Sequence, residues 1–226
     1  MHPVIAIDGP SGVGKGTVAR AVAAALGYRH IDTGAMYRAV AWRAQQLGAD
    51  LDDEEAVVAV ARAASLKVDG STVVIDGTDV SSAIRTPEID RATTRVARLP
   101  RVRAELVARQ RAIADEGPLV IEARDIGTVV FPDADVKIYL DASAEERARR
   151  RAHDPAHTAA QTQDLAHIAE AMQRRDENDR TRQASPLSVA EDATVIDTTG
   201  IPAAVVVARV MAVVRERCDL AARSST

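Results

Sequence analysis

Residues 9–17, GPSGVGKGT, have the residue types and spacing of a loop that binds phosphate groups. The glycines allow the backbone to turn tightly, so that successive N–H groups can point at one anion. A helical pattern follows the loop, and the unpaired N–H groups at its start add positive potential. Lys15 supplies a charge that can reach the outer phosphates of a nucleotide. The predicted site for a triphosphate therefore consists of Gly9, Pro10, Ser11, Gly12, Val13, Gly14, Lys15, Gly16 and Thr17.

This loop departs from the general pattern at one position. The pattern has a serine or threonine directly after the lysine, with its hydroxyl group on a magnesium ion. Here Gly16 intervenes, so Thr17 is the predicted source of that hydroxyl group. A plain glycine-rich turn is the alternative interpretation. The apolar run 4–7 before the loop and the helical pattern after it favour a phosphate-binding loop.

Two further stretches place polar side chains where a second ligand could bind. Residues 32–38, DTGAMYR, begin a predicted helix, and its first N–H groups, a hydroxyl group and Arg38 could hold a phosphate. Residues 122–125, EARD, follow a strand-like run, and open α/β sheets bind ligands at such strand ends. For Arg38 the alternative is a solvated arginine. For 122–125 it is a surface loop with a local ion pair.

A third group lies on one predicted helix before Ser185. Its members recur at spacings of four, three, four and three, which places them on one face at about 100° per residue. The apolar part of this face is thus continued by charged side chains, which usually have a partner or a function when they point inward. An ordinary Arg175–Asp179 ion pair is the alternative. The residues are Ile168, Met172, Arg175, Asp179 and Arg182.

The elements that would position these groups alternate between strand and helix. Such alternation predicts an α/β fold with a parallel sheet flanked by helices on both faces. The predicted strands are 3–8, 30–31, 119–121, 136–140 and 194–196, and the main helices are 15–26, 33–47, 52–64, 87–98, 100–115, 144–152, 164–181 and 202–220. In the second helix, Met36, Val40 and Leu47 share a face and are predicted to lie in the core.

The region between the third and fourth helices changes period. Three short strand-like runs, 66–68, 72–75 and 78–80, are separated by Asp-Gly pairs, which favours a small antiparallel β insert. Asp52 and Glu55 resemble a capping box at the start of the third helix. Residues 153–163 are polar and predicted to form a mobile loop. Because Pro155 opposes a helix there, we interpret His153 and His157 as solvated rather than as a metal pair.

The bulk composition excludes several classes of function. The 226 residues carry a net charge of -4 and 2% aromatic residues, which disfavours a general nucleic-acid or membrane-surface binder. Cys218 is the single cysteine, so an intrachain disulfide is impossible. No apolar run has the length of a membrane span, and no leader pattern precedes the first strand. We therefore expect a cytoplasmic protein.

The motifs together resemble one family. The loop ending GKGT is similar to that of nucleoside monophosphate kinases. The segments DTGAMYR, DGTDVSSAIR, LPRVR, EARDIGTVVFPDADVKIYLDAS and RRDENDRTRQASPL resemble bacterial cytidylate kinases in order and spacing, over about residues 3–200. Ala123 departs from the glycine usual in that family. The resemblance implies a P-loop NTPase-type sheet with the small β insert and a short lid, about residues 150–166.

The resemblance also implies a role for individual residues. Arg38, Arg124 and Arg175 would hold the phosphate of CMP, and Lys15 would act with Arg124 and Arg175 in catalysis. Asp179 would contact the sugar hydroxyls, with Tyr37 lining the pocket and Thr33 close by. The residues implied to contact cytosine are Thr94, Arg103, Asp125 and Arg182. Those implied to contact ATP from the lid are Arg147 and Arg151.

The implied reaction is direct transfer of a phosphoryl group from Mg-ATP to CMP or dCMP, which yields CDP or dCDP. We expect one domain over 1–226 and a monomer. Its core would be 1–31, 116–149 and 183–226, its CMP-binding region 32–115, and its lid with the following helix 150–182. The alternative functions are those of a UMP/CMP or shikimate-type kinase and of a non-catalytic nucleotide-binding module. A GTPase is excluded because the chain lacks the Asn-Lys-x-Asp guanine motif.

Overall fold

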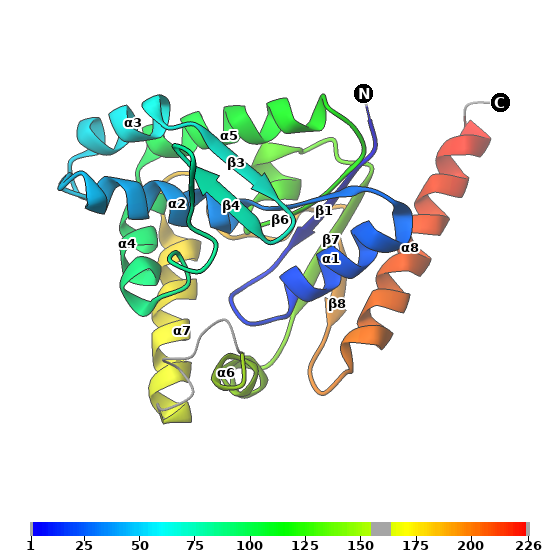
Figure 1. The fold of residues 1–226 in the computed structure, drawn as a ribbon. Coiled ribbons are helices and arrows are strands. Elements are labelled where there is room, and N and C mark those ends of the chain that lie inside the picture. Colours follow the sequence, from blue (N-terminus) through cyan, green and yellow to red (C-terminus); the bar gives the residue numbers. More distant parts are fainter. Residues whose placement is uncertain (1, 155–163, 225–226) are drawn as a thin grey trace.

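The central element of the computed structural model is a parallel sheet of five strands (Figure 1). The structure describes residues 2–154 and 164–224. The strands lie in the order β2, β6, β1, β7, β8, and every adjacent pair is parallel. Their bounds are β1 (Val4–Asp8), β2 (Arg29–Asp32), β6 (Leu119–Glu122), β7 (Val136–Asp141) and β8 (Thr194–Asp197). The predicted parallel α/β sheet is confirmed.

Both faces of this sheet are covered, which explains why β1 is apolar at successive positions. On one face, Ile5 and Ile7 pack with residues of α1 (Lys15–Leu26) and α8 (Ala203–Ser224). On the other face, Val4 and Ala6 pack with the π-helix η1 (Ile126–Val130) and with α5 (Pro100–Ala114). Figure 1 shows α1 and α8 side by side along the sheet. The sheet is thereby a rigid base for the loops at its strand ends.

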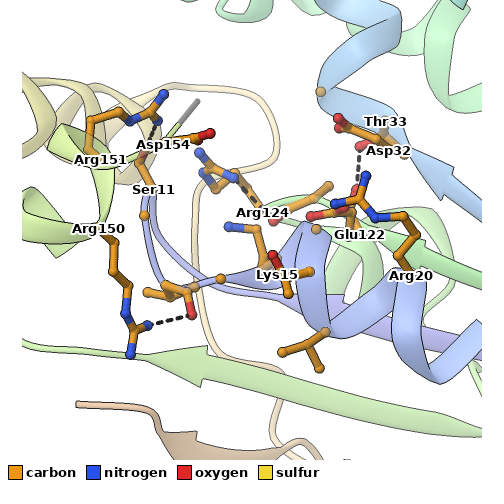
Figure 2. Close-up of a pocket in the computed structure, with 18 of the residues that line it drawn as sticks. Ser11, Lys15, Arg20, Asp32, Thr33, Glu122, Arg124, Arg150, Arg151 and Asp154 are labelled. Carbon is orange, nitrogen blue, oxygen red and sulfur yellow. Dashed lines mark hydrogen bonds between the residues drawn. The ribbon is translucent and has the colours of Figure 1, made fainter. Parts of the chain in front are cut away.

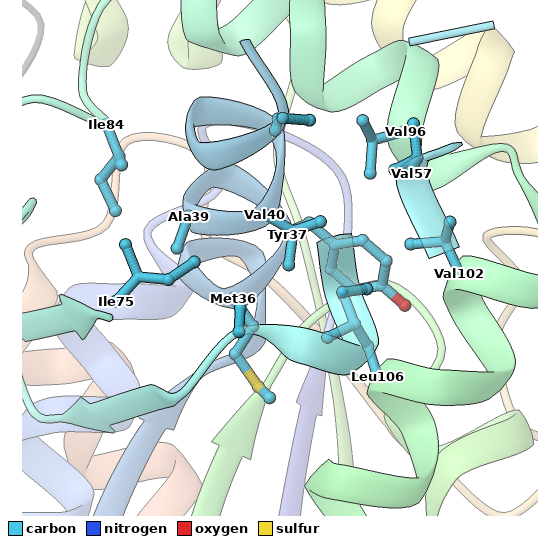
Figure 3. Close-up of a cluster of buried hydrophobic side chains, with 14 of the residues drawn as sticks. Met36, Tyr37, Ala39, Val40, Val57, Ile75, Ile84, Val96, Val102 and Leu106 are labelled. Atoms are coloured by element: carbon cyan, nitrogen blue, oxygen red, sulfur yellow. The ribbon is translucent and has the colours of Figure 1, made fainter. Parts of the chain in front are cut away.

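A second apolar core lies beside the sheet (Figure 3). Met36 and Val40 of α2 (Thr33–Gln46) are buried there against α3 (Glu54–Ala63), α4 (Pro87–Ala97) and α5. The predicted β insert is confirmed as an antiparallel sheet that also contributes to this core. Its strands are β3 (Leu66–Asp69), β4 (Thr72–Ile75) and β5 (Thr78–Asp79).

The two helices α6 (Ala144–Ala152) and α7 (Leu165–Thr181) pack together near the carboxyl ends of the strands (Figure 1). Ser143 begins α6 by accepting a hydrogen bond from the N–H of Glu146. Ile168 and Met172 are buried against Ala148, as the pattern on α7 predicts. The predicted loop 153–163 lies mostly outside the described residues, and the division into core, CMP-binding region and lid stays a prediction. Within 2–154 and 164–224, no helix is long and apolar enough to cross a membrane.

Three local expectations were wrong or incomplete. Leu47 is 57% exposed, because α2 ends at Gln46 and its last turn extends beyond the core. The third helix is capped by Asp53 rather than Asp52, and Asp53 accepts from two backbone N–H groups. Asp52 instead forms ion pairs with Arg95 and Arg98 on the neighbouring helix and turn. Periodicity did not indicate the π-helix η1.

The exposure of Leu47 leads to a stability prediction. Leu47→Gln is expected to change the free energy of unfolding by less than about 0.5 kcal/mol, as surface substitutions do. Val40→Ala, at a fully buried position of α2, is expected to cost about 2 kcal/mol because it leaves a cavity. Urea unfolding of both variants measures the difference. Equal losses would contradict the assignment of Leu47 to the surface.

Candidate active site

The loop between β1 and α1 has the backbone shape that its glycines allow. Gly9, Gly12 and Gly14 have φ angles of 145°, 79° and 92°, a region that other residues rarely adopt. A Cβ atom on Gly9 would lie 2.1 Å from the carbonyl oxygen of Leu140 on the adjacent strand. The loop therefore lies directly against the end of β7, and the alternative of an unconstrained glycine-rich turn does not describe it.

Lys15 is buried and folded back onto its own loop. Its Nζ atom donates hydrogen bonds to the carbonyl oxygens of Gly9, at 2.8 Å, and Pro10, at 2.7 Å. Burial, together with the nearby positive charge of Arg124, lowers the pKa of Lys15 to about 7. An anion in this loop would offset both effects. Figure 2 shows the Lys15 side chain between Arg124 and Glu122 in the pocket.

Glu122 supplies a physical reason for the departure at Gly16. This buried carboxylate ends β6 and lies 3.1 Å from the Nε2 atom of His30. A Cβ atom on Gly16 would lie 3.1 Å from the Oε1 atom of Glu122, which is tighter than ordinary contact. Thr33 donates a hydrogen bond from its hydroxyl group to the backbone oxygen of Glu122, at 2.8 Å. The glycine thus leaves room for a carboxylate beside the phosphate-binding loop.

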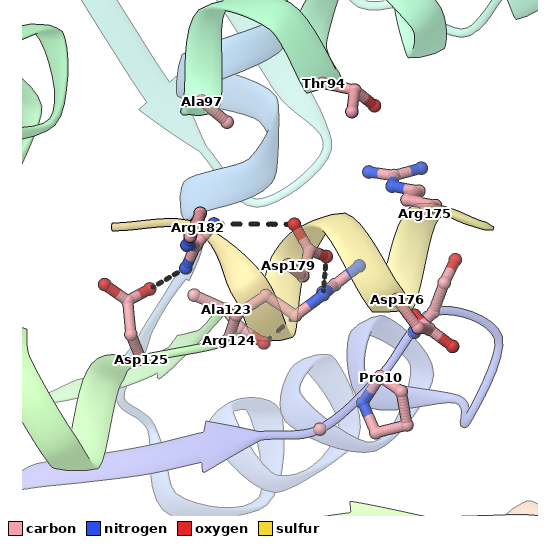
Figure 4. Close-up of polar contacts among 12 residues, drawn as sticks. Pro10, Thr94, Ala97, Ala123, Arg124, Asp125, Arg175, Asp176, Asp179 and Arg182 are labelled. Atoms are coloured by element: carbon pink, nitrogen blue, oxygen red, sulfur yellow. Dashed lines mark hydrogen bonds and ion pairs between the residues drawn. The ribbon is translucent and has the colours of Figure 1, made fainter. Parts of the chain in front are cut away.

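A second polar group lies at the other end of the pocket (Figure 4). Asp125 accepts from the Nη2 atom of Arg103 at 2.5 Å and pairs with Arg182 at 3.5 Å. Asp179 accepts from the Nε atom of Arg124 at 2.9 Å and from Arg182 at 3.4 Å. These side chains come from α5, from α7 and its C-terminal cap Arg182, and from the segment after β6. The predicted row on α7 therefore meets the predicted strand tip, and each acidic residue bridges two arginines.

The electrostatics of this group favour an ionised carboxylate at Asp179. Burial raises the pKa of Asp179, but the charges of Arg124, Arg175 and Arg182 outweigh burial and hold it below its usual value. The guanidinium of Arg103 lies over the ring of Tyr37, with its Cζ atom 5.2 Å from the ring centroid. This half of the pocket therefore presents paired charges beside an aromatic ring.

Arg38 is 8% exposed, so the alternative of a solvated arginine is wrong. It contacts Asp90 of α4 at 3.3 Å, and Arg175 contacts the same carboxylate at 3.3 Å. The helical phase of α2 did not indicate this burial, because the carboxylate that Arg38 contacts comes from α4, which spacing within α2 cannot reveal. Arg38 and Arg175 thus share one carboxylate partner, Asp90.

Most of the predicted site residues line one cavity of about 1250 Å³. They are Ser11, Gly12, Val13, Gly14, Lys15, Gly16, Thr17, Thr33, Tyr37, Arg38, Arg103, Arg124, Asp125, Arg151, Arg175, Asp179 and Arg182. Thr94 lies instead in a smaller pocket of about 370 Å³, and its neighbour Thr93 lines the larger one. Gly9 and Pro10 form the base of the loop and do not line the cavity.

The packing of Arg147 introduces Asp176, which sequence reasoning missed. Asp176 is 1% exposed and accepts a hydrogen bond from the N–H of Ser11 at 3.0 Å. Arg147 pairs with Asp176 and donates to the carbonyl oxygen of Ser11 at 3.1 Å. Arg147 therefore lies behind the loop rather than in the cavity. Asp176 escaped notice because it points away from the row of Arg175 and Asp179 on α7.

Arg150 and Arg151 also hold the phosphate-binding loop. Arg151 donates to the hydroxyl oxygen of Ser11 at 3.0 Å (Figure 2). Arg150 donates to the carbonyl oxygens of Val13, at 3.1 Å, and Thr198, at 2.6 Å, and it lines the cavity. Arg150 was not among the predicted residues, although its position in an arginine-rich helix was a usable signal.

The described residues contain no group of three or more His, Cys, Asp or Glu side chains placed to hold a metal ion. Thr17 is exposed at the start of α1 and lines the cavity. The Nδ1 atom of His153 contacts the backbone oxygen of Arg149 at 2.8 Å. His157 lies outside the described residues.

A phosphate-binding loop after the first strand of a parallel sheet, open to a cavity rich in arginines, defines the class of P-loop phosphotransferases. The family model for cytidylate kinase matches residues 5–216, and the chain belongs to this family. A cytidylate kinase of Geobacillus kaustophilus (strain HTA426) is 46% identical over 94% of this chain and 96% of the relative. A cytidylate kinase of Desulfitobacterium hafniense (strain Y51) is 44% identical over 95% of this chain and 94% of the relative.

The fold is also found in a solved structure of a distant protein. A gluconokinase from Sinorhizobium meliloti 1021 superposes with a TM-score of 0.52 over 99% of this chain and 97% of its own. The two are 16% identical, so this likeness concerns the fold alone.

Proposed function

We propose that the chain transfers the γ-phosphoryl group of Mg-ATP to CMP or dCMP and so forms CDP or dCDP. The observation that carries this proposal is the arrangement of one continuous cavity. A phosphate-binding loop lies at one end, and the Asp125 and Asp179 carboxylates, each bridging two arginines, lie at the other. Arg124 lines the cavity and also pairs with Asp179. A non-catalytic module has no need for the second half.

The donor end fits the phosphates of ATP. The loop N–H groups and the start of α1 would bind the phosphate oxygens. Lys15 would exchange its two carbonyl partners for phosphate oxygens. Magnesium keeps several water ligands and binds through few protein groups, which agrees with a site where Thr17 alone supplies a hydroxyl group. That ion would neutralise charge that develops on the phosphates during transfer.

The acceptor end fits cytosine better than uracil. Asp125 offers a carboxylate that can accept from the N4 amino group of cytosine, while Arg103 and Arg182 can donate to ring acceptors. Uracil has an oxygen in place of that amino group, so it would bring two acceptors together and leave buried groups unpaired. Arg38, Arg124 and Arg175 would hold the phosphate, and Asp179 the sugar hydroxyls. Asp125 is the residue on which base selection depends.

The remaining expectations are part of the same proposal. Transfer is direct and in line, because positioning and charge stabilisation are sufficient for phosphoryl transfer. Arg124 and Arg175 stabilise the transferred group together with Lys15, and Arg147 and Arg151 belong to helix α6 that faces the donor loop. A monomer in the cytoplasm that binds neither nucleic acid nor membrane stays a prediction.

A coupled assay of ADP release with Mg-ATP tests the proposal across CMP, dCMP, UMP, AMP and shikimate. We expect turnover with CMP and dCMP, and a kcat/KM for UMP at least about 10²-fold lower, because the carboxylate of Asp125 would face a carbonyl oxygen. Preferred turnover of shikimate or AMP would refute the proposal. ATP binding without turnover of any acceptor would favour the non-catalytic alternative.

The lowered pKa of Lys15 predicts proton uptake when ATP binds. In the free protein Lys15 titrates with a pKa of about 7, and bound phosphates favour the protonated form and raise that pKa. Above pH 7 the free side chain is mostly neutral, so binding must add a proton, and below pH 6 it adds almost none. Calorimetry in buffers of different ionisation enthalpy is expected to show uptake close to one proton at pH 8.5. Lys15→Met should abolish the proton uptake that is due to Lys15. Unchanged uptake in that variant would contradict the assignment of this proton to Lys15.

A further inference from the structure

We infer that Asp90 is an internal carboxylate that substitutes for the acceptor phosphate in the empty site and thereby sets the affinity for the acceptor. The inference rests on the proposed function, in which Arg38 and Arg175 hold that phosphate. Asp90 lies on α4, and no motif in the sequence singled it out.

Three guanidinium groups from different helices converge on this carboxylate. Its Oδ1 atom lies 3.3 Å from the Nε atom of Arg38 on α2 and 3.3 Å from the Nη1 atom of Arg175 on α7. Its Oδ2 atom lies 3.9 Å from the Nη1 atom of Arg151 on α6. Carboxylate and phosphate oxygens are equivalent partners for guanidinium groups. Asp90 therefore uses two of the donors, Arg38 and Arg175, that an acceptor phosphate requires.

The arginines in this cluster need a counter-ion because they are largely removed from water. Burial lowers the pKa of Arg175, and burial lowers the pKa of Arg151 to about 10, while the charge of Asp90 opposes both shifts. Without an anion, the mutual repulsion of these cations would destabilise the empty site. Asp90 supplies that anion when no acceptor is bound.

When a phosphate dianion is bound, the charge of Asp90 changes from stabilising to destabilising. It would compensate the same cations, and the negative charge of Asp90 would then repel it across a short, partly buried distance. An internal group that competes for a site lowers the apparent affinity of the external ligand. Asp90 thus weakens acceptor binding.

The surroundings allow the carboxylate to be removed. Arg38 also lies 3.9 Å from Asp32, which in turn contacts Arg85 at 3.3 Å. The side chain of Asp90 is 23% exposed, so water can reach the position. Asp90→Asn keeps the shape and removes the charge, and the variant is expected to fold.

The matched control is Glu88→Gln on the same helix. Glu88 is exposed and pairs with Arg91 at 3.3 Å, so its removal changes the net charge equally without touching the cluster. Asp90→Glu is the conservative variant, since it keeps a carboxylate on the same side of α4. Circular dichroism and thermal unfolding check that each variant is folded.

The experiment measures steady-state kinetics with CMP and the competitive inhibition of CMP by inorganic phosphate. In Asp90→Asn we expect KM for CMP and Ki for phosphate to fall about tenfold, as expected for removing one charge from a partly screened site. The KM for ATP and kcat should stay within about twofold. Glu88→Gln should leave all values unchanged, and Asp90→Glu should restore a KM within about threefold of the wild type.

An unchanged or higher KM for CMP in a folded Asp90→Asn variant would overturn the inference, as would an equal fall in Glu88→Gln. A wild-type protein that does not phosphorylate CMP would refute the proposed function instead. In that case direct titration of inorganic phosphate into wild type and Asp90→Asn, followed by calorimetry, decides the role of Asp90. Equal phosphate affinity would then count against it.

Discussion

Replacing Lys15 with methionine is expected to lower kcat by about 10²-fold or more, the scale found when one electrostatic donor to a transition state is removed. Lys15 is buried at the base of the cavity and makes two hydrogen bonds to its own loop. Its ammonium group can therefore exchange these carbonyl partners for phosphate oxygens without a rearrangement of the fold. Methionine keeps most of the volume of the side chain and removes the charge. Steady-state rates with Mg-ATP and CMP measure the loss.

The chain offers a matched control among its few lysines. Lys137 donates to the carbonyl oxygen of Pro132 and pairs with Asp192 at 2.8 Å, and it does not line the cavity. Lys137→Met should leave kcat within about threefold of the wild type. If a folded Lys15→Met variant kept near-normal turnover, Lys15 would have no part in the reaction.

The second large effect is expected at Asp179. Asp179→Asn should reduce kcat/KM for CMP by about 10²-fold, the scale for removing one partner of a desolvated charge pair. Asp179 orients Arg124 and Arg182, so its loss misplaces a phosphate ligand and a base contact together. The dissociation constant of ATP should change by less than about threefold, because the phosphate-binding loop is held by Asp176, on another side of α7.

Acceptor kinetics and ATP titration of the same variant separate the two halves of the site. Glu177→Gln, an exposed change two residues earlier on α7, is the control and should have no effect on either measurement. A parallel loss of ATP affinity in Asp179→Asn would place Asp179 on the donor side and would contradict the proposed division of the cavity.

The order of strands and helices along the chain followed from local sequence patterns alone. The run from Leu119 is buried on both faces and appears as a continuous apolar stretch, and the turns of the β insert carry Gly70 and Gly77 at positive φ. In these places the residue type restricts the backbone directly. The row of Arg175, Asp179 and Arg182 was predictable for the same reason, because helical phase depends only on spacing.

Contacts across the fold were outside the reach of such patterns. Asp176 lies 165 positions from Ser11 in the chain, and Asp90 lies 85 from Arg175. The burial of Arg38 depends on segments that are distant in the sequence. The exposure of Leu47 depends on where the end of α2 lies relative to the core. Neither is encoded within one helical turn.

The amino-acid sequence by itself therefore determined the phosphate-binding loop, the parallel α/β architecture and the row of Arg175, Asp179 and Arg182, since each is a matter of local backbone and spacing. Only the tertiary structure decided their partners. It turned Asp176 towards the loop, placed Arg147 behind that loop and set Asp90 among three arginines. The physical reason is that a charge is paired by whatever the fold brings within a few ångströms, and that distance is unrelated to separation along the chain.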